Sequence, residues 1–138
     1  MPVNQELVRR LLLYLEKMIS GMKRSGLTRK KLLDDEDLRL ATERRLQTAI
    51  EACIDIAFHI IAGENLGIVE HNKDAILLLG QKGVISKSLA NRVAAATDMR
   101  NVLVHGYGKI DFDLFYKAIL EDVIDLEEFI KKITLHIS

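Results

Sequence analysis

The sequence predicts an all-α protein, an up-and-down bundle of four long helices with one short helix added. The chain has a single proline, at position 2, so no proline interrupts the long segments that follow. Apolar residues recur three or four positions apart over most of the chain, which is the helical period. Its 138 residues, 49% of them hydrophobic, are enough to bury a core. We therefore expect residues 1–138 to form a single helical-bundle domain.

Two long helices are predicted in the first half of the chain. The first spans about Asn4 to Lys23, with an apolar stripe at Leu7, Leu11, Tyr14 and Met18. The segment Lys23–Lys31 then breaks the pattern and concentrates five positive charges. The second helix spans about Asp35 to Ala62, with Leu46, Ile50, Cys53, Ala57 and Ile61 on one face. The segment Gly63–Gly67 is expected to end it as a C-terminal glycine stop.

One short and two long helices are predicted in the second half. The short helix spans about Glu70 to Gly80, and Ser86 is a candidate N-cap for the next one. That helix has a stripe at Leu89, Val93, Ala96, Met99 and Leu103, and Gly106 and Gly108 stop it. Asp111 is expected to cap the last helix, whose stripe is the most regular: Phe112, Phe115, Ile119, Val123, Leu126, Ile130 and Ile133.

Composition excludes several classes of function. Lys+Arg and Asp+Glu number 20 each, so the chain has no global positive field for nucleic acid, and RNA contact would need a local patch such as Lys23–Lys31. The lone Cys53 excludes an intrachain disulfide and is expected to be a buried hydrophobe in a reducing cytosol. The N-terminal apolar run Leu11–Leu15 is too short for a signal peptide or a membrane span. We expect a cytoplasmic protein.

Chemically capable side chains concentrate between Asp98 and Gly108, at the end of the fourth long helix. Arg100 and His105 would lie about 140° apart on a straight helix, whereas Asn101 and His105 share a face. A tightened last turn would bring the guanidinium and the imidazole towards one cleft. Imidazole titrates near neutrality and can move protons, and a guanidinium stabilises negative charge on phosphorus oxygens. These residue types fit RNA cleavage without a metal.

A structural interpretation of the same residues is open. Arg100 would then pair with Asp98 or with an acidic residue of the second helix, and His105 would cap the helix end, where the helix dipole favours a cation. Residue types alone favour this interpretation, because an arginine followed five positions later by a histidine is a weak pattern.

The order of residues in this segment adds a resemblance. The run Arg-Asn-Val-Leu-Val-His-Gly-Tyr, residues 100–107, is followed by Ile110 and Asp111. It resembles the signature of the HEPN superfamily, most closely the HepT-like toxins of toxin–antitoxin pairs. Their pattern is Arg-Asn-x-x-x-His-x-Tyr, and every defined position is met. The likeness extends to residues 43–57 and 77–85, so it covers nearly the whole chain.

The resemblance implies a function and a site. Arg100 and His105 would be the catalytic pair of a metal-independent endoribonuclease that cleaves RNA by attack of the 2′-hydroxyl, and Asn101 would assist them. Tyr107 would accept adenylyl groups from a partner nucleotidyltransferase, the antitoxin. The family's members form homodimers in which the motifs line a shared cleft, and no cofactor is implied.

Other interpretations differ in class from the enzyme. The bundle could be a non-catalytic module that binds a nucleotide or a nucleotidyltransferase, or a plain dimeric structural bundle. A dimer is also expected because Val102 and Val104 lie away from the Met99–Leu103 stripe, so that a second surface requires burial. Asp55 and His59, four positions apart, have no third ligand at a suitable spacing. We interpret them as a polar spot at a helix interface rather than as a metal site.

Overall fold

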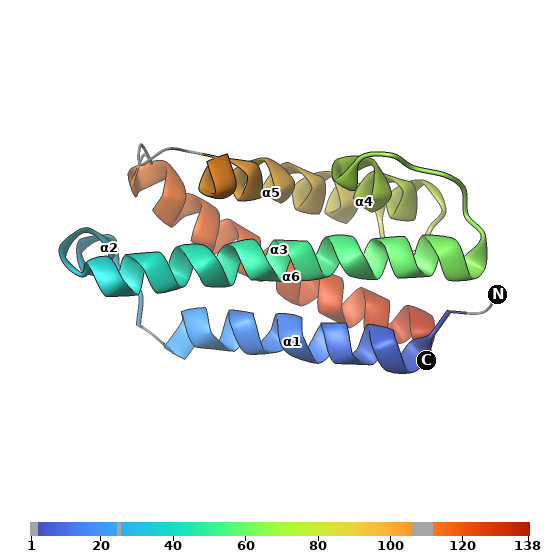
Figure 1. The fold of residues 1–138 in the computed structure, drawn as a ribbon, viewed down its shortest axis with the longest axis horizontal. Helices are drawn as coiled ribbons and strands as arrows, with labels where there is room; N and C mark the ends of the chain where they lie inside the picture. The colour runs from blue at the N-terminus through green and yellow to red at the C-terminus, as the bar shows by residue number, and fades with distance from the viewer. Residues whose placement is uncertain (1–2, 25, 106–111) are drawn as a thin grey trace.

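The computed structural model describes residues 3–24, 26–105 and 112–138, and for residues 100–105 it describes the backbone. The described part of the chain is an antiparallel helical bundle (Figure 1), which confirms the predicted all-α class. Four helices are long and two are short. In chain order they are α1 (Gln5–Arg24), α2 (Arg29–Asp34), α3 (Glu36–Glu64), α4 (Asn72–Gln81), α5 (Lys87–His105) and α6 (Phe112–Ile137).

The short helix α2 is not predicted by the sequence pattern. It lies in the basic segment that we expected to be a break, and two residues explain it. The hydroxyl of Thr28 accepts a hydrogen bond from the Lys31 backbone N–H at 3.1 Å, which caps the helix. Leu32 is buried and anchors α2 in the core. Capping and one apolar contact thus stabilise a helix with no repeating apolar stripe.

The predicted buried face of α1 is wrong by one position. The buried residues are Val8, Leu12, Leu15, Ile19 and Met22, and Tyr14 is exposed. The run Leu11–Leu15 supplies apolar side chains on more than one side of the helix, so periodicity alone leaves the rotation of α1 open. The exposed position suits the tyrosine, whose hydroxyl then remains in water.

Helix α3 is the centre of the bundle and packs against each of the other five helices. It is the one described helix long and apolar enough to cross a membrane, but much of it is buried inside the protein, as expected of a core helix. Its predicted face is confirmed: Leu46, Ile50, Cys53, Ala57 and Ile61 are all buried. Burial raises the pKa of the Cys53 thiol, so this cysteine is an unreactive hydrophobe as expected.

The end of α3 differs from the predicted glycine stop. Asn65 is the C-cap, in the left-handed conformation with φ 53°. Gly63 lies inside the helix, where an added Cβ would come within 2.6 Å of the Val3 backbone. The glycine is therefore explained by the close approach of the N-terminal segment rather than by helix termination.

Helices α4 and α5 form a tightly packed pair. Ser86 is confirmed as the N-cap of α5, since its hydroxyl accepts a hydrogen bond from the Leu89 N–H at 3.1 Å. Gly80 of α4 faces Ala90 of α5 so closely that an added Cβ would lie 2.6 Å from the alanine Cβ. Helix α4 begins at Asn72, two residues after the predicted start.

Helix α6 closes the bundle and runs back along α5 (Figure 1). Four residues of its predicted stripe, Phe115, Ile119, Leu126 and Ile133, are buried. The expected cap, Asp111, lies outside the described residues. The start of α6 lies at the same end of the bundle as α2 and the end of α5, where the motif occurs.

Candidate active site

Residues 100–105 of the motif form the C-terminal segment of α5. The backbone of Arg100, Asn101 and His105 is helical, and α5 extends to His105. The side chains of these three residues lie outside the described part of the structure, and so does the whole of Tyr107. The convergence of Arg100 and His105 on one cleft therefore stays a prediction, as does the role of Tyr107 as the acceptor of adenylyl groups. The described residues around them give the setting of the motif.

Two contacts hold the first turn of α6 at this end of the bundle. Arg29 of α2 forms an ion pair and hydrogen bond with Asp113. Arg39 of α3 places its guanidinium 5.3 Å from the centre of the Phe112 ring, a cation–π contact. Helices α2 and α3 thereby fix the start of α6. The position of this turn relative to the motif end of α5 is thus set by residues from two other helices.

The basic segment Lys23–Lys31 carries less free charge than its sequence indicates. Lys23 pairs with Glu127 of α6 at 3.2 Å, and Arg29 pairs with Asp113. Lys30 and Lys31 are exposed beside the acidic start of α3. Two of the five positive charges therefore attach this segment to α6, in pairs that are partly exposed to solvent.

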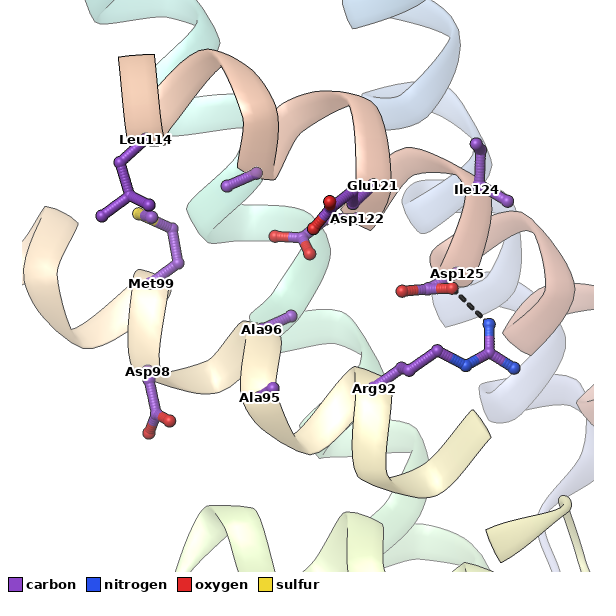
Figure 2. A pocket seen from close by; sticks show the side chains of 11 residues that line it. Arg92, Ala95, Ala96, Asp98, Met99, Leu114, Glu121, Asp122, Ile124 and Asp125 are labelled. Atoms are coloured by element: carbon purple, nitrogen blue, oxygen red, sulfur yellow. Dashed lines mark hydrogen bonds and ion pairs between the residues drawn. The ribbon is translucent and has the colours of Figure 1, made fainter. Parts of the chain in front are cut away.

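A groove runs between α5 and α6 towards the motif (Figure 2). Its volume is about 590 Å³, and it reaches Met99, the residue that precedes Arg100. Its walls are mainly small or aliphatic: Ala95, Ala96, Met99, Leu114, Ala118 and Ile124. At the end away from the motif, Arg92 bonds Asp125 at 2.5 Å and Glu128 at 3.3 Å. These bonds raise the pKa of Arg92 and tie the two helices together.

Asp122 is the unusual residue of this groove. Its carboxyl group is turned towards α5, into the space beside Ala96 (Figure 2), and the residue is only 8% exposed. Its Oδ2 has no hydrogen-bond partner among the residues that the structure describes. Burial raises the pKa of Asp122 to about 7, and the negative charges of Asp125 and Glu121 add to the effect. The groove thus contains a carboxyl group that changes charge near neutral pH.

Sequence reasoning missed Asp122, although the sequence contains a signal for it. Phe115, Ile119, Asp122 and Leu126 follow one another at helical spacing, so the aspartate occupies a position of the buried face. A carboxylate at such a position is costly unless it is paired or protonated. A single acid within a regular apolar stripe is therefore a signal, readable from sequence, for a buried carboxyl group.

The proposed polar pair Asp55 and His59 is exposed on α3 rather than placed at a helix interface, so that part of the interpretation is wrong. Among the residues that the structure describes, no three histidine, cysteine, aspartate or glutamate side chains are grouped so as to hold a metal ion.

The fold and the motif at the end of α5 define a HEPN-type helical bundle. The chain belongs to the HepT-like family, described as "Ribonuclease HepT-like", whose model matches residues 6–133.

Two curated relatives are similar. The mRNA nuclease HepT of Shewanella oneidensis is 35% identical over 85 residues, which are 62% of this chain and 64% of that protein. The tRNA nuclease HepT of Aphanizomenon flos-aquae is 36% identical over 87 residues, or 63% and 59%. The matched segments thus span slightly less than two thirds of these relatives.

A solved structure is similar over almost the full length of both chains. It is the tri-AMPylated HEPN toxin of Shewanella oneidensis in complex with its MNT antitoxin. The TM-score is 0.86 with 26% sequence identity, and the match covers 93% of this chain and 96% of that chain. The predicted kinship with HepT-like toxins is confirmed.

Proposed function

We propose that this chain is the toxin of a toxin–antitoxin pair, a metal-independent endoribonuclease with its active site at the end of α5. The observation that carries the proposal is the family match over residues 6–133, which includes the complete Arg-Asn-x-x-x-His-x-Tyr motif. The names of the relatives, an mRNA nuclease and a tRNA nuclease, support RNA as the substrate class. Such a substrate is consistent with a cytoplasmic location.

The proposed reaction is an intramolecular transfer on RNA. The ribose 2′-oxygen attacks the adjacent phosphorus, and His105 takes the proton of the 2′-hydroxyl. The bond from phosphorus to the 5′-oxygen breaks, and that oxygen takes up a proton. The products are a 2′,3′-cyclic phosphate and a 5′-hydroxyl. Arg100 stabilises the charge that builds on the non-bridging oxygens, and Asn101 holds the imidazole or the phosphate by a hydrogen bond.

His105→Ala and Arg100→Ala test the assignment of the catalytic pair. Each should reduce RNA cleavage in EDTA by about 10²-fold or more, because one loses the proton carrier and the other the cation. Both residues lie at a helix end, so circular dichroism and melting temperature should change little. Undiminished cleavage by His105→Ala protein would overturn the mechanism. A wild-type protein that binds RNA or a nucleotide without cleaving it would favour the binding-module alternative.

We further propose that a partner nucleotidyltransferase neutralises the toxin at Tyr107. The similar structure of an AMPylated toxin bound to its MNT antitoxin supports this. The tyrosine oxygen attacks the α-phosphorus of ATP, pyrophosphate leaves and the hydroxyl proton is released. The phosphate added at Tyr107, two residues from His105, competes for Arg100 and repels the RNA backbone.

Mass measurement tests the role of Tyr107. With the cognate nucleotidyltransferase, ATP and magnesium, the wild-type protein should gain whole multiples of the AMP mass and lose cleavage. Tyr107→Phe protein should gain none and still cleave RNA, because the hydroxyl serves only as the attachment point. Tyr14 and Tyr116 are the other tyrosines of the chain, so Tyr14→Phe is a matched control that should be modified normally. Full modification of Tyr107→Phe protein would exclude this site.

We also propose that the active protein is a homodimer. The sequence places Val102 and Val104 away from the predicted stripe of α5, and the first half of α6 presents three exposed apolar residues: Leu114, Leu120 and Ile124. This side of the bundle adjoins the groove that leads to the motif, so pairing there would bring two motifs close together. Sedimentation at micromolar concentration should detect a dimer, and a protein that remains monomeric would contradict the proposal.

A further inference from the structure

The α5–α6 groove holds one buried acid that lacks a described partner. The carboxyl group of Asp122 is turned into the groove (Figure 2), and the residue is 8% exposed. Its Oδ2 has no hydrogen-bond partner among the residues that the structure describes. A buried carboxylate is costly unless a cation or a hydrogen-bond donor accompanies it. Asp122 is therefore suited to receive a cation from outside the chain.

Negative charge exceeds positive charge around Asp122. Arg92 is shared by two acids, since it bonds Asp125 at 2.5 Å and Glu128 at 3.3 Å. With Asp122 there are three carboxyl groups for this one guanidinium, an excess of two negative charges when all three are ionised. The other two acids that line the groove each pair with a lysine. A ligand with two positive charges would balance this excess.

The spacing of the acids on α6 indicates how far apart these two positive charges should lie. Asp122 and Asp125 are three residues apart, so they lie on one side of the helix with a rise of about 4.5 Å between them. The dashed line in Figure 2 joins Arg92 to one oxygen of Asp125, and a carboxylate accepts further hydrogen bonds at its other oxygen. Two ammonium groups joined by three or four methylene groups are separated by about one helical turn. A single lysine side chain of another protein would balance only one of the two charges.

The walls of the α5–α6 groove favour an organic cation over a metal ion. They are mainly aliphatic and include Ala95, Ala96, Met99 and Ala118, which pack well against methylene groups. A magnesium ion keeps several of its waters, and such walls offer those waters no hydrogen bonds. Within the described part of the chain, no three potential ligand side chains are grouped so as to hold a metal ion. The groove volume of about 590 Å³ is in the range of small-molecule sites.

We propose that the α5–α6 groove binds a linear aliphatic polyamine, a methylene chain that carries two or more ammonium groups. One ammonium group bonds Asp122 and the next bonds Asp125, while the methylene chain lies on the alanine and methionine walls. The polyamine thus brings the cation that the buried carboxylate requires. The binding site is distinct from the proposed catalytic pair Arg100 and His105, so the inference does not rest on the ribonuclease.

Calorimetric titration with spermidine, a triamine, tests the site. The wild type should bind one spermidine per chain. Asp122→Asn keeps the size of the side chain and removes a buried charge, so the variant should fold, and its dissociation constant should rise about tenfold or more. Asp55→Asn removes the same charge from an exposed position of α3 and should bind as the wild type does. Spermidine should raise the melting temperature of the wild type and of this control, but not that of Asp122→Asn protein.

A series of ligands tests the charge and shape of the groove. Diamines with three or four methylene groups should bind about tenfold or more tightly than butylamine, which has one ammonium group. Magnesium ions carry two charges within a shell of water and should not displace spermidine at equal concentration. Ala95→Leu narrows the groove without changing its charge and should weaken the binding of spermidine several-fold.

The binding of spermidine should also depend on pH through Asp122. Burial raises the pKa of Asp122 to about 7, and a bound ammonium group favours the ionised carboxylate. The affinity should therefore rise between about pH 6 and about pH 8. The other charged groups that line the groove are Arg92 and Asp98 of α5 and Glu121 and Asp125 of α6. Asp122→Asn protein keeps all four, so an equal pH dependence in both proteins would contradict the assignment to Asp122.

The results that overturn the proposal are distinct from those that overturn the ribonuclease. A wild type that does not bind spermidine, an Asp122→Asn variant that binds it equally well, or magnesium that competes equally would each exclude the site. Binding that occurs only in Arg100→Ala protein would show that the Arg100 side chain fills the groove instead. Affinity that falls as sedimentation detects a dimer would show that a second copy fills it. Spermidine binding by a protein that never cleaves RNA would leave the site standing and reject only the enzyme.

Discussion

Helix α5 has two neighbours, and it meets them in different ways. Against α4, small residues bring the two helices into direct contact: Gly80 touches Ala90 so closely that there is no room for a Cβ. Against α6, small residues instead line an open groove, with Ala95 and Ala96 on its walls and a buried carboxyl group inside. Small residues thus allow close packing between α4 and α5, whereas between α5 and α6 they line an open groove.

The difference indicates the role of each of the two interfaces, α4–α5 and α5–α6. The α4–α5 seam has little space left and no described ion pair other than the exposed Lys73–Asp98 contact, so its role is packing. The α5–α6 seam is held by Arg92 and Asp125 at one end, and the motif lies at the other. Between these ends it keeps an unfavourably buried acid, Asp122. Costs of this kind are typical of functional sites in proteins.

A valine introduced into each of the two helix interfaces should reveal the difference between them. Gly80→Val should lower the free energy of unfolding by about 3 kcal/mol, because the new methyl groups collide with Ala90 and the helices must move apart. Ala95→Val, on the wall of the open groove, should cost less than about 1 kcal/mol, mostly from helix propensity. Urea denaturation measures both. Equal losses would mean that the groove is not open space in solution.

The pH dependence of stability should identify Asp122. Its pKa is about 7 in the folded chain against an ordinary value of 3.8, so the folded state holds a proton that the unfolded state releases. Stability from this group is present at about pH 4 and is lost as the pH rises through 7. Asp122→Asn removes the buried charge, and should stabilise the protein by about 1–2 kcal/mol at pH 8 with little effect at pH 4.

The measurement is the melting temperature of both proteins at the two pH values, at a dilution where sedimentation finds monomer. The difference between wild type and variant isolates Asp122 from the other titrating groups. A stabilisation at pH 4 as large as that at pH 8 would show that the charge of Asp122 is not its cause.

Local signals predict most of the fold. The starts of α3 at Asp35 and of α5 at Ser86 are predictable because a side-chain oxygen before an apolar run has a specific partner, the third backbone N–H of the helix. The face of α3 is predictable because its buried residues repeat over 29 positions. Long helices with one regular stripe are therefore readable from sequence.

What could not be predicted depends on tertiary contact. The predicted rotation of α1 is wrong because the Leu11–Leu15 run offers two faces, and only packing against α3 selects one. Helix α2 depends on a single buried leucine, Leu32. Gly63 is not the helix stop that its sequence position suggests, since its reason is the approach of Val3, a segment 60 residues away in sequence.

For the candidate site, the sequence supplied the motif and its place on the chain, since α5 extends to His105. The groove that leads to the motif could not be predicted, because its shape depends on how α5 and α6 pack against each other. Nor did pattern reading single out Asp122, although its spacing from Ile119 and Leu126 puts it on the buried face of α6.

The chemistry of the cut RNA end tests the central claim most directly. Wild-type protein, purified and kept in EDTA, is incubated with a short RNA, and the product ends are identified by mass spectrometry. We expect cleavage that leaves a 2′,3′-cyclic phosphate and a 5′-hydroxyl, with the product absent from a parallel reaction with His105→Ala protein. Products that carry a 5′-phosphate, or cleavage that requires a divalent metal ion, would contradict an active site built from Arg100 and His105.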